Sequence, residues 1–275
     1  MSLVLAAFLA TGGALLAADN VRQEAWKVLE TGLNNQSSDQ RVDAVQALGL
    51  IVGNRKAEKM AETALHDDKT EVRSAAATAL GQIQLRSSIP ALKKALSDND
   101  ASVVTAAAHS LVSFGNDDGY EIYYEILTGE RKSGAGIIDQ QLKVLQNPKK
   151  LTEMGIEAGL GFVPFGGMGL SLIKILTSSD ASYVRAAAAQ MLVHDPDPRT
   201  AKALVKATLD KSWVVRQAAV KAIGQRDDPS LLKAVSPAMN DENEGVRDAA
   251  AAVVIRLGDK ARGGRDSKSA GSPSK

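Results

Sequence analysis

A short phrase recurs along this 275-residue chain at a fixed interval. Each copy opens on Val, continues in most copies with Arg, and then contains alanines or other small residues; the copies begin at Val72, Val103, Val184, Val215 and Val246. Consecutive copies on either side of the middle of the chain lie 31 residues apart. A fixed period between about 20 and 50 residues is typical of stacked repeat arrays. The period therefore predicts a solenoid, which grows unit by unit and needs no single large core.

Each repeat is expected to hold two helices. Small or apolar residues lie three, four, seven and eight positions after Val72, which is the spacing of a helix buried along one side. Proline is tolerated in the first turn of a helix, so the prolines at three places predict where first helices begin: Pro90, Pro198 and Pro229. Gly81 and Gly224 follow the apolar stripe of two second helices, and we expect them to be C-caps.

An acidic residue precedes each second helix by a few positions, and Arg follows the repeat Val in four of five copies. The acidic residues are Asp67, Asp98, Asp180, Asp210 and Asp241. One interpretation is a row of carboxylate–guanidinium sites that face a ligand. The interpretation that we favour is structural: the Asp caps the second helix, and the Arg pairs with an acid in its own or the next repeat.

These residues resemble HEAT repeats, specifically the short HEAT-like repeats named after phycobilisome lyases. The resemblance rests on residues 67–92, 180–192, 210–224 and 241–257, with a weaker first copy at 40–49. It implies an all-α, right-handed α-solenoid of about seven helical hairpins. It does not imply one activity, because such repeats occur in bilin lyases, in deoxyhypusine hydroxylase, in DNA-alkylation repair proteins and in many scaffolds.

Composition excludes several kinds of site. The chain has no Cys, which excludes disulfides, thiolate metal sites and thiol catalysis. Lys and Arg number 33 against 32 Asp and Glu, so no strong field toward nucleic acid or an anionic membrane is expected. The glycines of residues 159–169 are followed by no Gly-Lys-Ser/Thr and preceded by no strand, so they match neither phosphate-binding fingerprint.

The amino-terminal segment, residues 1–18, is apolar or small and carries no charged side chain. It resembles the apolar region of a signal peptide with small residues before Asp19, although the basic residues that precede such a region are missing. The alternatives are an apolar helix that caps the first repeat, or a membrane anchor, for which the segment is short. We expect export to the periplasm or medium of a bacterium, and otherwise a cytoplasmic protein.

The repeat phrase is interrupted in the middle of the chain. Val103 and Val184 lie 81 residues apart, which is two periods and 19 further residues. Residues 119–127 and 137–145 are expected to be helical, whereas residues 155–169 contain many glycines and Pro164, which favours an irregular loop. Long irregular inserts in compact proteins are usually functional.

Six of the ten aromatic residues of the chain lie in or at the edge of this interruption: Phe114, Tyr120, Tyr123, Tyr124, Phe162 and Phe165. The three tyrosines have the spacing of one helical face. Aromatic side chains with polar groups are enriched where proteins bind partners. The interpretation that we favour is that Phe162 and Phe165 fill a gap where the repeat register breaks, with the tyrosines packed beneath them; contact with a membrane surface is a further alternative.

The face of each second helix opposite its buried stripe should be exposed. It comprises the second, sixth and tenth residues after the repeat Val: Ser74, Thr78, Gln82; Thr105, His109, Ser113; Ala186, Gln190, His194; Gln217, Lys221, Gln225; Asp248, Ala252, Arg256. This predicted ridge is polar and mostly neutral. It is expected to line the concave surface on which solenoids bind partners. Nucleic-acid binding would need many more cations there.

No residue pattern points to catalysis. An iron site like that of deoxyhypusine hydroxylase would require His-Glu pairs, yet Asp67, Ser110 and Asp195 follow the three histidines. A site at His66, Asp67 and Asp68 would offer a weak ligand set. A bilin lyase, as a chaperone of its chromophore, would not need Cys, but nothing else favours that activity. No nucleophile motif or catalytic carboxylate pair stands out.

These observations predict a non-catalytic scaffold that binds another protein, with no cofactor, no metal, no nucleic acid and no stable membrane insertion once a signal is removed. We expect a monomer. The predicted organisation is a signal or apolar segment (1–18), N-terminal repeats (19–115), a degenerate repeat with the Gly-rich insert (116–177), C-terminal repeats (178–258) and a disordered basic tail (259–275). The predicted partner-binding residues are Tyr120, Tyr123, Tyr124, Phe162, Phe165, His109, Gln190, Gln217 and Lys221.

Overall fold

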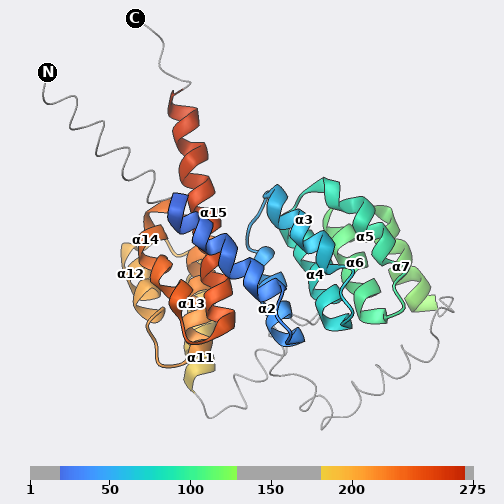
Figure 1. Ribbon diagram of the computed structural model, residues 1–275, viewed down its shortest axis with the longest axis horizontal. Coiled ribbons are helices and arrows are strands. Elements are labelled where there is room, and N and C mark those ends of the chain that lie inside the picture. The colour runs from blue at the N-terminus through green and yellow to red at the C-terminus, as the bar shows by residue number, and fades with distance from the viewer. Residues whose placement is uncertain (1–18, 129–180, 270–275) are drawn as a thin grey trace, which may run out of the picture. The chain divides into compact units, whose positions relative to one another are not determined.

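The structure is a computed structural model and describes residues 19–128 and 181–269 (Figure 1). Within these ranges every regular element is a helix, as the 31-residue period predicts. The chain divides into two compact units. We call residues 35–183 the central unit, and residues 1–34 with 184–275 the terminal unit, because the latter contains both ends of the chain.

Helical hairpins follow one another through the described part of the central unit (Figure 1). The helices are α2 (Ser38–Leu48), α3 (Arg55–Ala64), α4 (Thr70–Ile83), η1 (Arg86–Ser88), α5 (Ile89–Ala95), α6 (Ala101–Ser113) and α7 (Asp117–Thr128). α3 and α5 are the first helices of hairpins whose second helices are α4 and α6. α4 also packs against α2 and α6, so second helices contact the second helices of neighbouring repeats.

Local sequence accounts for where these helices begin. The Asn54 side chain accepts hydrogen bonds from the N–H groups of Lys56 and Ala57, and thereby caps α3. Asp100 caps α6 through the N–H of Ser102. Pro90 is the second residue of α5, as predicted, where a missing N–H costs nothing.

The core of the central unit is built from the repeated small residues. The stripe after Val72 is buried, with relative exposure of at most 2% at the repeat Val and at the four following stripe positions. The equivalent residues of α6 are at most 4% exposed. α6 packs against α7 through Val104, Ala108 and Ile122, with Leu96 and Tyr123 at the edge of this cluster. Alanine allows the second helices to lie close together.

Gly81 and Gly224 are not C-caps, contrary to the prediction. α4 continues to Ile83 and α13 to Arg226, and each ends on a non-glycine residue with positive φ: Gln84 and Asp227. Both glycines lie inside helices that approach a neighbour closely. A Cβ at Gly81 would lie 2.4 Å from Ser110 Oγ, and one at Gly224 would lie 2.5 Å from a methyl group of Val253. The glycines therefore serve close packing between repeats.

The terminal unit contains a helix over residues 19–33 and the repeats that follow the interruption (Figure 1). Its further helices are α11 (Ala181–Met191), which begins at the boundary of the units, α12 (Pro198–Ala207), α13 (Trp213–Arg226), η2 (Pro229–Leu231), α14 (Leu232–Val235), η3 (Ser236–Asn240) and α15 (Glu244–Ser269). α12 pairs with α13, and η2, α14 and η3 together take the place of a first helix beside α15. Pro198 and Pro229 begin α12 and η2, as predicted.

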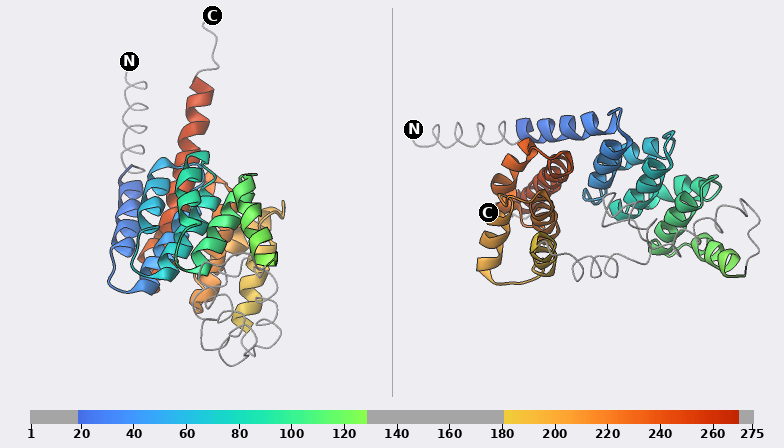
Figure 2. Two further views of the ribbon diagram at one scale, coloured as in Figure 1. Left: turned by 90° about the vertical axis from the view of Figure 1, so that its right-hand side faces the viewer. Right: turned by 90° about the horizontal axis from the view of Figure 1, so that it is seen from below.

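The helix over residues 19–33 lies beside α15, although more than 200 residues separate them in the chain (Figures 1 and 2). Arg22 donates from Nε and Nη2 to Asp259 Oδ1 at 2.8 Å, and Arg262 pairs with Asp19. The guanidinium of Arg22 also lies 5.9 Å from the ring centroid of Trp26. The first described helix therefore joins the last repeat.

The last helix extends beyond residue 258, where the disordered tail was predicted to begin. α15 continues without a break to Ser269. Asp259 and Lys260, assigned to the tail, form ion pairs with Arg22 and Asp227. The ion pairs of Asp259, Lys260 and Arg262 with Arg22, Asp227 and Asp19 join this extension to the rest of the terminal unit.

The interruption is described only at its start. α7 confirms the helix predicted for residues 119–127 and begins two residues earlier. The helix predicted for residues 137–145 and the glycine-rich segment 155–169 lie outside the described residues, as do residues 1–18 and the last residues of the predicted tail. Among the helices that the structure describes, none combines the length and the apolar character needed to cross a membrane.

Candidate partner-binding surface

The repeated Arg and Asp residues form ion pairs between successive hairpins, which we call the inter-repeat ladder. Each Arg follows the repeat position of one second helix, and each Asp lies in the loop before the next second helix. The pairs are Arg41–Asp67, Arg73–Asp98, Arg185–Asp210 and Arg216–Asp241, with shortest N–O distances of 2.7–3.1 Å. The predicted pairing of Arg with an acid of the next repeat is thus confirmed.

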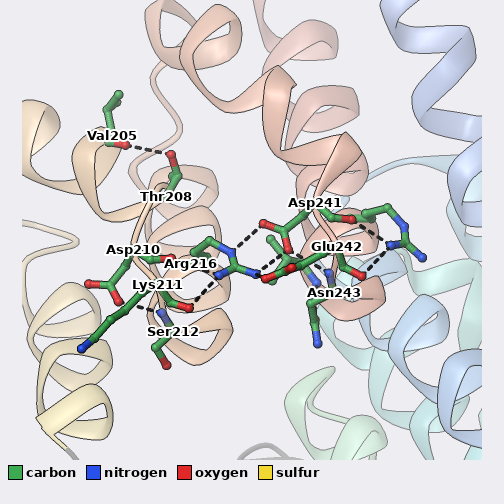
Figure 3. Close-up of polar contacts among 11 residues, drawn as sticks. Val205, Thr208, Asp210, Lys211, Ser212, Arg216, Asp241, Glu242 and Asn243 are labelled. Carbon is green, nitrogen blue, oxygen red and sulfur yellow. Dashed lines mark hydrogen bonds and ion pairs between the residues drawn. The ribbon is translucent and has the colours of Figure 1, made fainter.

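Three of these Arg residues, Arg41, Arg73 and Arg216, also donate to carbonyl groups of the loop before their own helix. Arg216 Nη1 donates to the carbonyl oxygens of Asp210 and Lys211, at 3.0 and 3.1 Å, while Nε and Nη2 reach Asp241 (Figure 3). Arg73 repeats this pattern, with Nη1 on the carbonyls of Asp67 and Asp68. One guanidinium therefore links two loops in two consecutive repeats, which is the bidentate geometry for which Arg is suited.

The predicted role as helix caps is wrong for Asp67, Asp98, Asp210 and Asp241, whereas Asp180 lies outside the described residues. Asp241 Oδ1 accepts from the N–H of Asn243, and Asp67, Asp98 and Asp210 do the same two residues onward. These contacts close a turn before the helix, which short acidic side chains form readily. The residues at the cap position are different ones, namely Lys69, Asp100 and Ser212.

These contacts lower the pKa of the ladder carboxylates. At Asp67 the hydrogen bond from Arg41 is the main cause, and the backbone N–H of Lys69 adds to it. At Asp241 partial burial opposes ionisation, but the hydrogen bonds from Arg216 and from the N–H of Asn243 outweigh it, so the pKa is lowered. Ladder carboxylates are therefore held ionised by the stacking.

The predicted exposed ridge is correct only toward the carboxyl ends of the second helices. At its first position Ser74, Ala186 and Asp248 are buried, and Ala252 is buried as well. The physical reason is the close approach of neighbouring second helices: Ser74 Oγ donates to the carbonyl of Ser102 in the next repeat at 3.1 Å. A side chain of a second helix that points away from the first helix of its own hairpin can therefore still be buried against the neighbouring repeat.

The exposed part of the ridge consists of uncharged polar side chains. It comprises Gln82, His109 and Ser113 in the central unit, and Gln190, His194 and Gln225 in the terminal unit. We call these six residues the polar ridge. Gln217 and Lys221, also predicted to bind a partner, are half-buried on α13. Gln190 Nε2 donates to the carbonyl of Ala218 at 3.0 Å, so this side chain bridges α11 and α13.

The three tyrosines of α7, predicted to share one face, differ in their exposure. Tyr120 and Tyr124 are exposed, with relative exposures of 48% and 63%. Tyr123 instead packs at the edge of the cluster of Val104, Ala108 and Ile122, and this burial raises the pKa of its phenol. Tyr123 thus lies at the side of α7 that borders the contact with α6.

The predicted binding residues are therefore only partly brought together. Tyr120, Tyr124 and His109 lie on adjacent helices of the central unit, and Gln190, Gln217 and Lys221 lie in the terminal unit. Phe162 and Phe165 lie outside the described residues.

Several exposed apolar side chains were not predicted. Met191 and Leu209 have relative exposures of 78% and 80%, and Val184 and Trp213 are about half exposed. Val184 occupies the repeat position that is buried in the other four copies, so the period alone predicts burial there. For Trp213, its place at the first residue of α13, before the buried stripe begins, is a signal that could have indicated exposure.

His66, Asp67 and Asp68, considered above as a weak metal site, have other contacts in the structure. Asp67 and Asp68 both accept from Arg41, at 2.8 and 3.1 Å, and His66 is exposed. Over residues 19–128 and 181–269, no three His, Cys, Asp or Glu side chains gather in a way that could hold a metal ion.

Solved structures of helical-repeat proteins are similar to this chain. One is the complex of CpcE and CpcF of phycocyanin lyase from Nostoc sp. PCC7120, with 21% identity, a TM-score of 0.34 and coverage of 86% of this chain and 92% of that one. Human deoxyhypusine hydroxylase in complex with glycerol is 18% identical, with a TM-score of 0.35 and coverage of 88% and 98%. A designed armadillo repeat protein is 17% identical, with a TM-score of 0.26 and coverage of 84% and 98%. Likeness at this level carries no argument about activity.

The comparison with curated proteins gives no match. The family model described as HEAT repeats matches residues 27–112 and 170–256, on both sides of the interruption. These two regions make up more than half of the chain and contain all four ion pairs of the inter-repeat ladder. The chain therefore belongs to the HEAT-repeat family.

Proposed function

We propose that this protein is a non-catalytic scaffold that binds another protein through α7 and the polar-ridge residues of the central unit, Gln82, His109 and Ser113. The observation that carries the proposal is the exposure of Tyr120 and Tyr124, one turn apart on α7. Tyrosine offers a large, rigid contact area at a low cost in side-chain entropy, and it is enriched at the energetic centres of protein interfaces.

The character of the polar ridge supports a protein partner over a nucleic acid. Its six members are glutamine, histidine and serine side chains, which form adaptable hydrogen bonds with peptide groups. Binding to a phosphate backbone gains most of its free energy from Lys and Arg. The repeated Arg residues are engaged between hairpins: the Arg216 side chain is only 8% exposed.

The ion pairing of the ladder Asp residues with Arg also supports a scaffold rather than an enzyme. Catalytic carboxylates need an environment that tunes their pKa toward the pH of the reaction. The ladder carboxylates have the opposite property, because Arg and backbone N–H groups lower their pKa. A stoichiometric content of iron in the purified protein would argue instead for a hydroxylase-like enzyme.

An affinity capture with the intact chain tests the proposal. The Tyr120→Ala/Tyr124→Ala variant should lose the bound protein, because it removes the exposed aromatic area from α7. Glu121→Ala is the matched control, since Glu121 is exposed on the same helix between the two tyrosines. Identical partners and yields for all three proteins would reject the role of α7.

We propose that the glycine-rich insert, which lies outside the described residues, also contributes to binding. Deletion of residues 159–169, which removes Phe162 and Phe165, should weaken the same interaction. An unchanged set of partners would reject the role of the insert but leave that of α7 standing.

Two further parts of the proposal have separate tests. Titration of duplex DNA at low salt should show no binding, whereas salt-sensitive binding would favour the nucleic-acid alternative. For export, mass spectrometry of the mature amino terminus should find Asp19 as the first residue; retention of residues 1–18 would contradict cleavage there.

A further inference from the structure

The loop between α12 and α13 differs from the equivalent loops of the other repeats. The positions six, four and two residues before the repeat Val hold Leu209, Lys211 and Trp213 in this loop. In the other four copies of the phrase the same positions hold polar, acidic or small residues: His66, Asp68, Thr70; Ser97, Asn99, Ala101; Ser178, Asp180, Ser182; Asn240, Glu242, Glu244. One loop of the array therefore carries a leucine, a lysine and a tryptophan that the stacking of repeats does not require.

The two apolar side chains of this loop are exposed on a backbone that is held in place. Leu209 is 80% exposed and Trp213 is 46% exposed. Between them, the carbonyl oxygens of Asp210 and Lys211 accept hydrogen bonds from Arg216 Nη1 at 3.0 and 3.1 Å. Figure 3 shows that the Lys211 side chain extends away from Arg216. The loop is thus fixed by the inter-repeat ladder, and binding would order little additional backbone.

The exposed face of α12 adds two further lysines beside the loop. Lys202 and Lys206 are exposed and lie one turn apart, on the side of the helix opposite the buried Leu204. The N–H of Leu209 donates to the carbonyl oxygen of Lys206 at 3.1 Å, so the loop begins as a continuation of the same turn. We call Lys202, Lys206, Leu209, Lys211 and Trp213 the basic–apolar patch.

The lysines of the basic–apolar patch carry uncompensated charge, although the net charge of the chain is only +1. In the part of the chain that the structure describes, none of the three takes part in an ion pair. An acid before each of α12, α13 and α15 is by contrast paired with arginine: Asp197 with Arg199, Asp210 with Arg185 and Glu242 with Arg216. A nearly neutral chain therefore presents a locally positive surface around two exposed apolar side chains.

This composition fits an anionic lipid surface better than a protein partner. Lysine is depleted in protein interfaces, and leucine is under-represented at their energetic centres. Surfaces that rest on bilayers combine lysine with exposed leucine and tryptophan. Lysines are attracted to anionic headgroups, the indole ring is favoured at the level of the headgroups, and aliphatic side chains reach the acyl boundary.

We propose that the terminal unit binds the surface of a bilayer that contains anionic lipids, through the basic–apolar patch. Leu209 and Trp213 enter the headgroup region, and the three lysines lie against the anionic headgroups. Three cations and two apolar side chains give a reversible attachment and not an insertion. This site goes beyond the proposed protein-binding function, which rests on α7 of the central unit, and either can fail without the other.

Co-sedimentation of the full chain with lipid vesicles tests the proposal. The bound fraction should be several-fold larger on vesicles of phosphatidylcholine mixed with phosphatidylglycerol than on phosphatidylcholine alone. It should also fall as the salt concentration rises, because salt screens the attraction between lysines and headgroups. This comparison needs no variant, so its outcome does not depend on how a substitution folds.

Tryptophan fluorescence reports whether the loop itself enters the bilayer. The chain has two tryptophans, and Trp26 is only 5% exposed. A shift of the emission to shorter wavelength on addition of the anionic vesicles should therefore come from Trp213. Unchanged emission of vesicle-bound protein would contradict the placement of Trp213 in the headgroup region.

Leu209→Ser/Lys211→Glu introduces residue types that other repeats hold at the same two positions, so the fold should be kept. This double variant should lose several-fold in binding to the anionic vesicles and should show no shift of the Trp213 emission. Val52→Ser/Lys59→Glu is the matched control, since it makes the same kinds of change at an exposed valine and an exposed lysine of the central unit. It should bind as the wild type does.

Three results would overturn the proposal. One is equal binding of the wild type to both kinds of vesicle, or binding to neither. The second is an equal loss of binding in the patch variant and in the matched control, which would assign the effect to total charge. The third is loss of a protein partner from the patch variant with vesicle binding unchanged, since the patch would then be a protein-binding surface.

Discussion

Arg216 of α13 reaches across to the following repeat and donates from both Nε and Nη2 to the two carboxylate oxygens of Asp241, at 2.7 Å each (Figure 3). The two side chains are 8% and 9% exposed, which makes this the most enclosed ion pair of the inter-repeat ladder. The same pairing between Arg185 and Asp210 is more open, with exposures of 40% and 21%. The ion pairs of the ladder therefore share one geometry but differ in how far they are buried.

Removal of Arg216 should destabilise the protein far more than removal of Arg185. Arg216→Ala leaves a largely buried carboxylate without its partner, which typically costs about 3–5 kcal/mol of unfolding free energy, whereas exposed pairs contribute about 0–1 kcal/mol. Denaturant unfolding of the two single variants measures the difference. Equal losses of stability would show that burial of the ladder does not govern its strength.

The ladder should make the protein sensitive to acid. The pKa of Asp241 is lowered from its ordinary value of 3.8 in the folded protein, so the unfolded chain takes up a proton first as the pH falls. The stabilisation is therefore complete well above pH 4 and is lost as the pH falls through the lowered pKa. Asp241→Asn should reduce stability at pH 7 and also flatten its decline below about pH 5.

Unfolding free energies of the wild type and Asp241→Asn between pH 7 and pH 3 check this expectation. Arg216→Gln serves as the companion variant, since it keeps the carboxyl group but removes the hydrogen bonds that lower its pKa. It should flatten the same part of the profile. A decline as steep as that of the wild type in both variants would contradict the assignment of acid sensitivity to this pair.

The sequence was sufficient to predict the repeat architecture because the same phrase gives a buried stripe in four of its five copies. It also predicted that Arg73 and its equivalents would pair with acids, since Arg and Asp recur at a fixed offset. It could not show that Ser74 and Asp248 are buried, because their burial depends on how closely adjacent second helices approach. Helical spacing alone likewise could not separate Tyr123 from Tyr120 and Tyr124.

The two glycines expected to be C-caps illustrate the same limit. Glycine near the end of an apolar stripe is consistent with a helix stop and with a close helix crossing, and local sequence does not distinguish the two. The contact with the neighbouring repeat shows that both are close helix crossings, because Ser110 lies close to Gly81 and Val253 lies close to Gly224. The exposure of Val184 on α11 could not be predicted for a comparable reason, because its sequence matches the phrase as well as the buried copies do.

Gly81→Ala should destabilise the central unit, in contrast to a glycine replacement at an open site. The new methyl group would lie 2.4 Å from Ser110 Oγ and 3.2 Å from Ser110 Cα, so α4 and α6 must separate, at a cost of about 1–3 kcal/mol. At Gly258 the nearest atom to a new Cβ is 3.7 Å away, and alanine there should stabilise α15 by up to about 1 kcal/mol. Thermal unfolding of both variants compares them, and a stabilised Gly81→Ala protein would contradict the close crossing.

The helix over residues 19–33 should be needed for the stability of the last repeat. Leu29 on this helix is fully buried, and Arg22 pairs with Asp259 of α15. Leu29→Ala opens a cavity and typically costs about 2–5 kcal/mol. Because both elements belong to the terminal unit, amide hydrogen exchange in α15 should become faster, while exchange in α4 of the central unit should change less. Lys27→Ala, an exposed change on the same helix, is the control. Unchanged exchange in α15 of the Leu29→Ala variant would show that the first helix does not support the last repeat.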